Sequence, residues 1–147
     1  MEPSVLMQFK DLGLAAAISL AACGSAVGTG AAGMAAIGAW KKCYTQSKAA
    51  PLLLTAFVGA PLSQTIYGMI LMNKISQAAA AGNFYWGVGI LGGLAMGASA
   101  MFQGKAGAGG ADALAETGKG FTNYLMVLGV IETIAIFVMV FLMQQVK

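Results

Sequence analysis

The sequence predicts an all-α membrane protein in which four transmembrane helices form two tandem helical hairpins. Of the 147 residues, 59% are hydrophobic and only 9% are charged, a composition typical of membrane proteins. The charged side chains lie at the ends of four apolar runs, each long enough for the ~20 helical residues that cross a bilayer. Glu132 is the exception, because it lies in the middle of the last apolar run.

The first apolar run extends from about residue 12 to residue 40 and consists largely of small residues. Four of these residues recur at every fourth position: Gly24, Gly28, Ala32 and Ala36. Small residues at this spacing allow two helix backbones to approach closely in lipid. We therefore expect a tightly packed helix, which is too long for the apolar region of a signal peptide. A polar loop over residues 41–48 is expected to follow.

The second run extends from about residue 49 to residue 72 and contains two prolines. Pro51 suits the first turn of a helix. Pro61 lies in the middle of the run, where it removes one backbone hydrogen bond and frees the carbonyl four residues earlier. Three polar residues after Pro61 share adjoining parts of one helix face: Ser63, Gln64 and Tyr67. A short polar connection over residues 73–83 is expected next.

The third run, from about residue 84 to residue 108, repeats the pattern of small residues. Its glycines are again spaced by four: Gly89, Gly93 and Gly97. Gln103 lies near the end of this run. A loop that begins near Gly109 and contains Asp112 and Glu116 is expected to lead into the fourth run, residues 121–143.

Glu132 is the strongest candidate for a functional residue. An ionised carboxylate at the centre of a bilayer costs about 2.5–3.5 kcal/mol on insertion scales. We therefore expect either a proton or a bound cation to neutralise it. The alternative is a structural glutamate that forms a hydrogen bond with a neighbouring helix, but intramembrane acids are rarely only structural.

The chain contains an internal repeat, which divides it into a first hairpin over residues 1–78 and a second over residues 79–147. In this repeat Gln64 occupies the position of Glu132, and Met34 that of Gln103. Duplicating two spans preserves orientation, so both within-hairpin loops lie on the same side. These loops hold most of the lysines, and the positive-inside rule then places them in the cytoplasm and both termini outside.

The first and third runs are thin, whereas the second and fourth carry bulky side chains such as Phe57, Leu71, Phe137 and Phe141. Thin helices pack at a small radius and bulky helices at a large one. We therefore expect a closed ring of copies, with the thin helices inside and the bulky helices facing lipid. Such rings form when a head-to-tail interface closes by rotation.

Taken together, these features resemble the proteolipid (c or K) subunit of V-type rotary ATPases. The resemblance covers nearly the whole chain and is closest to the K subunit of bacterial sodium-translocating V-type ATPases. Three local motifs carry it: Pro61-Leu-Ser-Gln-Thr-Ile-Tyr-Gly68, Phe102-Gln-Gly-Lys105 and Val130-Ile-Glu-Thr133.

The resemblance implies a role for each candidate site residue. Glu132 would carry the ion, with Ser63, Gln64 and Gln103 as oxygen donors to Na+. Tyr67 would form a hydrogen bond with the carboxylate, and the backbone carbonyl of Ala60 would complete the set of ligands. The sequence departs from the family pattern at two of these positions. Ser63 stands where threonine is usual, and Ala60 where leucine is usual, but serine keeps the oxygen.

Elementary chemistry favours Na+ as the transported ion over H+ alone. Hard cations bind several oxygen ligands, and one carboxylate with neutral oxygens leaves the loaded site uncharged. Two glutamines at membrane depth are costly if they only support a protonated glutamate. The alternatives that remain are a proton-translocating rotor, and glutamines that serve only as contacts between helices.

The resemblance also implies partners, while the sequence argues against other functions. The ring would work with a stator subunit that supplies an arginine, with central-stalk subunits and with membrane lipid. This chain has no arginine, no basic cluster for nucleic acid and no Walker-type phosphate loop. It is therefore expected to be a non-catalytic part of a complex that hydrolyses or makes ATP. A small four-helix exporter is the alternative of another class, although exporters favour inverted repeats.

Overall fold

The computed structural model describes residue 9 and residues 11–147 of the chain, and the described part is helical. Four helical stretches are long and apolar enough to cross a membrane, which confirms the predicted all-α membrane fold. They are α2 (Leu12–Thr45), an interrupted helix made of α3 (Leu54–Gly59), η1 (Ala60–Leu62) and α4 (Ser63–Ala80), α5 (Trp86–Thr117) and α6 (Phe121–Gln145).

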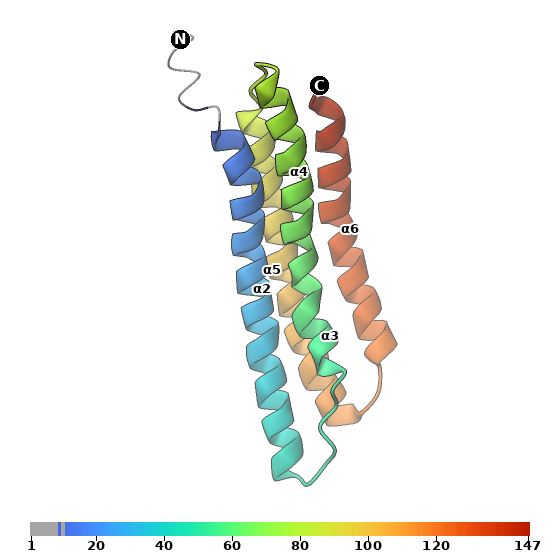
Figure 1. Ribbon diagram of the computed structural model, residues 1–147. Coiled ribbons are helices and arrows are strands. Elements are labelled where there is room, and N and C mark those ends of the chain that lie inside the picture. Colours follow the sequence, from blue (N-terminus) through green and yellow to red (C-terminus); the bar gives the residue numbers. More distant parts are fainter. Residues whose placement is uncertain (1–8, 10) are drawn as a thin grey trace.

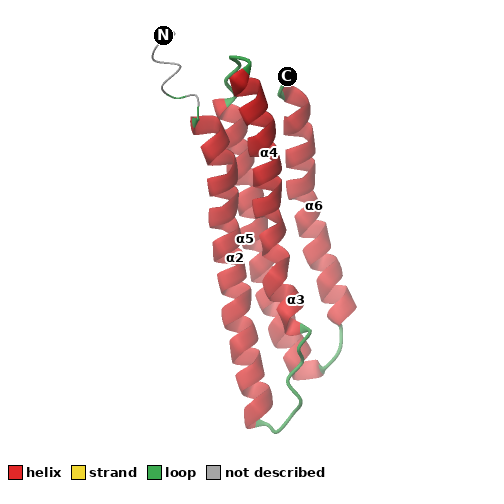
Figure 2. Cartoon of the chain, in the orientation of Figure 1, coloured by secondary structure: helices red, strands yellow, loops and turns green. Residues whose placement is uncertain are grey.

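The helices lie alongside one another as two hairpins (Figure 1). The connections from α2 to α3 and from α5 to α6 lie at the same end of the bundle, as the repeat predicts. The start of α2, the connection from α4 to α5 and the end of α6 lie at the opposite end. Short loops join all the helices (Figure 2). The side of the membrane on which each end lies stays a prediction, and residues 1–8 and Lys10 lie outside the described residues.

The two helices rich in small residues, α2 and α5, share the most extensive interface in the chain. A Cβ atom placed on Gly24 would overlap the backbone of Gly97, and one on Gly104 would overlap the backbone of Gly28. These backbones approach so closely only because glycine has no side chain. The predicted function of the small-residue pattern in helix packing is therefore confirmed for these glycines.

The bulky helices flank this pair, and α6 is the most exposed of the spans. Large apolar side chains project outward along α6, among them Val130, Ile134, Phe137 and Phe141. Not every bulky residue behaves in this way. Leu54, Phe57 and Leu71 are fully buried, because they pack against small residues of α2 and α5 rather than facing outward.

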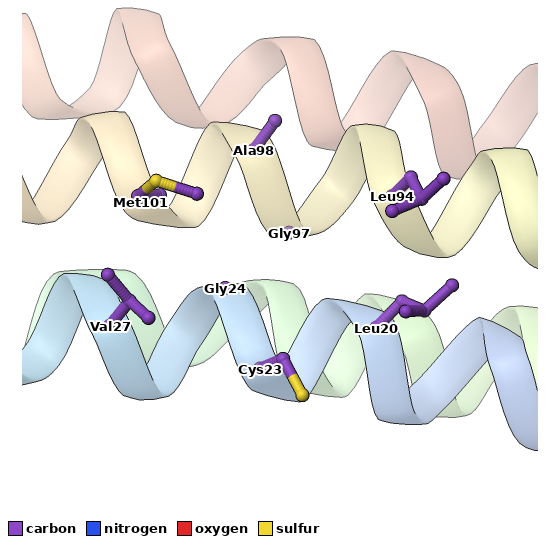
Figure 3. A pocket seen from close by; sticks show the side chains of 8 residues that line it. All are labelled: Leu20, Cys23, Gly24, Val27, Leu94, Gly97, Ala98 and Met101. Carbon is purple, nitrogen blue, oxygen red and sulfur yellow. The ribbon is translucent and has the colours of Figure 1, made fainter.

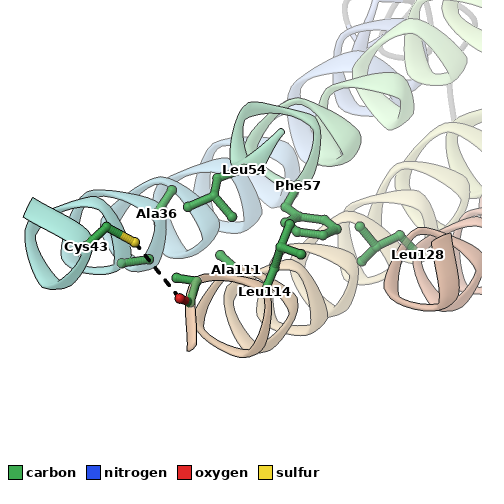
Figure 4. Packing of buried hydrophobic residues seen from close by; sticks show 9 residues of the cluster. Ala36, Cys43, Leu54, Phe57, Ala111, Leu114 and Leu128 are labelled. Carbon is green, nitrogen blue, oxygen red and sulfur yellow. Dashed lines mark hydrogen bonds between the residues drawn. The ribbon is translucent and has the colours of Figure 1, made fainter. Parts of the chain in front are cut away.

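One cluster of these buried side chains fills the end of the bundle near the within-hairpin loops (Figure 4). Phe57 from α3 contacts Ala111 and Leu114 of α5 and Leu128 of α6, while Cys43 lies at the edge of the cluster. The two cysteines, Cys23 and Cys43, are free, as their separation along one helix predicts. This apolar packing joins both hairpins below the polar residues described next.

Three of the predicted loops are too long, because the helices continue beyond the apolar runs. Residues 41–45 belong to α2, residues 73–80 to α4 and residues 109–117 to α5. Polar residues at a membrane boundary can remain helical in water, and Lys42 of α2 pairs with Glu116 of α5 at 3.5 Å. Pro51 was predicted in a first helical turn, yet it precedes α3, and its carbonyl accepts a hydrogen bond from Trp40 Nε1 at 2.9 Å.

Candidate ion-binding site

Pro61 interrupts the second span as predicted, and it does so next to the candidate site. The chain changes from α-helix to a 3₁₀ turn over Ala60–Leu62 and returns to α-helix at Ser63. Pro61 removes the hydrogen bond that the carbonyl of Phe57 would accept in a regular helix. This carbonyl faces Gly107 of α5, where an added Cβ would be 3.0 Å away. A glycine on the neighbouring helix thus provides room for the interrupted backbone.

Glu132 lies near the middle of α6 and is half-buried. Its Oε1 accepts a hydrogen bond of 2.6 Å from the hydroxyl of Tyr67 on α4. Its Oε2 accepts a weaker one of 3.3 Å from Nε2 of Gln103 on α5. Within the described residues, no lysine lies within 4.0 Å of this carboxylate. The acid is therefore held by neutral donors from two other helices.

Gln103 and Gln64 form a fully buried amide pair, each with 0% of its surface exposed. Nε2 of Gln64 donates to Oε1 of Gln103 at 2.8 Å. Besides contacting Glu132, Nε2 of Gln103 donates to the backbone carbonyl of Leu128 at 3.0 Å. Both donor hydrogens and the oxygen of the Gln103 amide are therefore engaged, which fixes its orientation between the two hairpins.

Three oxygen atoms gather where the helix resumes after Pro61. The hydroxyl oxygen of Ser63 lies 3.1 Å from the carbonyl oxygen of Ala60 and 3.2 Å from Oε1 of Gln64. A serine hydroxyl has only one hydrogen to donate, so it can satisfy just one of these two acceptors at a time. A small group of oxygens with too few hydrogens is the kind of surrounding that a hard cation occupies.

The structure thus brings all six predicted site residues into one continuous network. Hydrogen bonds join Ala60, Ser63, Gln64, Gln103, Glu132 and Tyr67 in an unbroken chain. The network contains a single carboxylate and otherwise neutral oxygen and nitrogen atoms. It draws residues from the interrupted helix, from α5 and from α6, and so depends on both hairpins.

Sequence reasoning missed one polar contact beside this network. The buried hydroxyl of Ser99 on α5 donates to the backbone carbonyl of Ile131 at 2.9 Å. The signal in the sequence is weak: Ser99 and Gln103 are polar residues four positions apart on a helix that is otherwise mostly small or apolar.

The most enclosed groove on the described chain lies elsewhere. It has a volume of about 290 Å³ and lies between α2 and α5, where Gly24 and Gly97 meet (Figure 3). Leu20, Val27, Leu94 and Met101 project around it, and its lining is apolar. It therefore offers nothing to hold an ion, and the polar network remains the candidate site.

Fold and site together define a multi-pass membrane protein with a carboxylate site in the middle of its spans. Residues 86–144 match the family model that describes the C chain of ATP synthase, its membrane proteolipid. This match includes α5, most of α6, Gln103 and Glu132. No curated protein shows a significant match to the chain. The family match supports a proteolipid of an ATP synthase or ATPase, which is a non-catalytic, ion-translocating membrane component of a rotor ring.

Proposed function

We propose that this chain is a rotor-ring subunit of a V-type ATPase or ATP synthase that carries Na+ across the membrane on Glu132. The observation that carries the proposal is the single network that joins Glu132 to Gln64, Gln103, Ser63 and the carbonyl of Ala60. One negative charge among neutral oxygens becomes uncharged when it binds one monovalent cation. An uncharged loaded site is what transit past lipid requires.

Na+ fits this network better than a proton alone does. Neutralising Glu132 by protonation would need only one or two acceptors, and Tyr67 already donates to the carboxylate. The oxygens of Ala60, Ser63 and Gln64 would then have no role in transport. A cation gives them one, because hard cations prefer several oxygen ligands.

A ring of copies is supported by the two flanks of the chain. One flank carries an apolar groove between α5 and α6, lined by residues that include Leu91, Ile134 and Phe137. The other carries an apolar groove between α2 and α3, lined by residues that include Ile37, Val58 and Leu62. Different apolar surfaces on two flanks favour head-to-tail association, which can close into a ring.

In the proposed cycle, each copy takes Na+ from one aqueous half-channel of a stator subunit and releases it into a second half-channel. A stator arginine would displace the ion from Glu132 between the two. Moving one charge through the membrane potential involves about 2.3 kcal/mol per 100 mV. Several such steps would couple to ATP hydrolysis or synthesis in a separate soluble part of the complex.

Carbodiimide labelling tests this function because the reagent attacks a protonated carboxyl group. We expect Glu132 to be labelled in the purified ring, and added Na+ to slow the labelling by competing with the proton. Potassium at equal ionic strength is the control. Labelling that responds to pH but not to Na+ would support the proton-translocating alternative instead. A stable dimer in place of a ring would support the exporter alternative.

A further inference from the structure

Ser99 contacts the backbone from which the Glu132 side chain starts. It lies on α5 one turn before Gln103, and 5% of its surface is exposed. Its hydroxyl donates a hydrogen bond of 2.9 Å to the carbonyl of Ile131 on α6. This carbonyl belongs to the peptide group that contains the backbone nitrogen of Glu132. The contact is thus adjacent to the proposed ion carrier without touching its carboxylate.

Gln103 makes a second contact of the same kind one turn further along. Its Nε2 donates to the carbonyl of Leu128 at 3.0 Å, which in a regular helix also accepts the backbone N–H of Glu132. The two donors lie four residues apart on α5, and the two acceptors three residues apart on α6, so each pair lies on one helix face. Two hydrogen bonds therefore join α5 and α6 on either side of the Glu132 backbone nitrogen.

These bonds matter because packing alone holds α6 weakly. Only Leu128 and Ala135 are buried among the residues of α6. A shift of α6 by one residue means about 1.5 Å along the axis and about 100° of rotation. Either movement would break both bonds and turn Glu132 away from Tyr67, whose hydroxyl lies 2.6 Å from the carboxylate.

We propose that Ser99 is a positioning residue for ion binding. Its hydrogen bond to Ile131 fixes the height and rotation of α6, and so directs the Glu132 carboxylate toward Tyr67 and Gln103. This inference rests on the proposed function of Glu132 as the ion carrier. It adds a residue that contributes no oxygen to the ion and acts only through the backbone.

The test measures carbodiimide labelling of Glu132 in the purified full-length ring, with and without Na+. The variants are Ser99→Ala, which removes the hydroxyl, and Ser99→Cys, which keeps the shape with a weaker donor. For Ser99→Ala we expect the Na+ concentration that halves labelling to rise about two- to tenfold, the range for one lost hydrogen bond. Ser99→Cys should give an intermediate value.

Leu142→Ala is the matched control for a merely structural effect. Leu142 packs against Gly92 of α5, ten residues after Glu132 in the same interface. The substitution should lower the melting temperature of the ring while leaving the half-protecting Na+ concentration unchanged. The proposal would be overturned if Ser99→Ala left this concentration unchanged, or if Leu142→Ala raised it equally at a similar loss of melting temperature.

The outcome is distinguishable from failure of the proposed function. If Na+ does not protect the unaltered ring, the sodium function fails whatever the variants do. The positioning role is then decided by the labelling rate without Na+, which should change at least about twofold in Ser99→Ala and remain unchanged in Leu142→Ala. An unchanged rate in Ser99→Ala would contradict the positioning role.

Discussion

The two hairpins contribute to the candidate site in different ways. The first supplies neutral groups from a helix interrupted at Pro61, namely the carbonyl of Ala60 and the side chains of Ser63, Gln64 and Tyr67. The second supplies the only carboxylate from an uninterrupted helix, α6. Gln64 stands in the first hairpin where the repeat has Glu132 in the second. A duplicated hairpin that lost one of two acids retains a site with a single charge.

The largest expected effect comes from removing this charge. Glu132→Gln should abolish carbodiimide labelling and Na+ binding, because the amide has no negative charge for a cation to neutralise. Ring assembly should persist, since glutamine keeps the shape and can accept the hydrogen bond from Tyr67. Glu116→Gln, at the exposed end of α5, is the control and should label normally. Sodium binding by Glu132→Gln would contradict the assignment of the carrier.

Removing the neutral side of the comparison should have the next largest effect. Gln64→Leu deletes one oxygen ligand and leaves Oε1 of Gln103 buried without its donor, a loss of about 1–3 kcal/mol. The half-protecting Na+ concentration should therefore rise about tenfold or more. Gln77→Leu, on an exposed part of α4, is the control. An unchanged concentration in Gln64→Leu would mean that the glutamine only joins the helices.

A smaller effect is expected from Tyr67→Phe, which removes one of the two donors to Glu132. The remaining aromatic ring preserves packing, so only the hydrogen bond is lost. Hydrogen bonds to charged groups contribute about 1.5–3 kcal/mol, but the half-buried carboxylate can find other donors. We therefore expect weaker Na+ protection and faster labelling, measured in the same titration. Tyr44→Phe, on an exposed turn of α2, should change neither quantity.

The smallest effect should come from the ion pair that joins the two hairpins outside the site. Lys42 and Glu116 are 3.5 Å apart and largely exposed, and such pairs contribute about 0–1 kcal/mol. Lys42→Ala should lower the melting temperature of the ring only slightly and leave Na+ protection unchanged. A large change in protection would mean that the hairpins are coupled through this end and not through the glutamine pair.

Much of this arrangement could be predicted from the sequence because membranes impose simple rules. Apolar length predicted the four spans, and the spacing of Gly24, Gly28 and Gly97 predicted the contact of α2 with α5. The rarity of intramembrane acids drew attention to Glu132. The family motifs led to Gln64, Gln103 and the other candidate residues, which the structure joins by hydrogen bonds.

Other features depend on tertiary contacts that leave no spacing in the sequence. Helices α2, α4 and α5 continue past the apolar runs because a polar residue in water does not end a helix. The burial of Phe57 depends on glycines and alanines of α5, which lie some fifty residues later in the chain. The bond from Ser99 to the carbonyl of Ile131 has no sequence signal on α6, since every residue has a carbonyl group.

Equilibrium binding of radioactive sodium to the purified ring tests the central claim most directly. The account predicts one sodium ion per chain, displaced by acid and absent in Glu132→Gln. Rings that assemble normally and label at Glu132, yet bind no sodium at any pH, would contradict it.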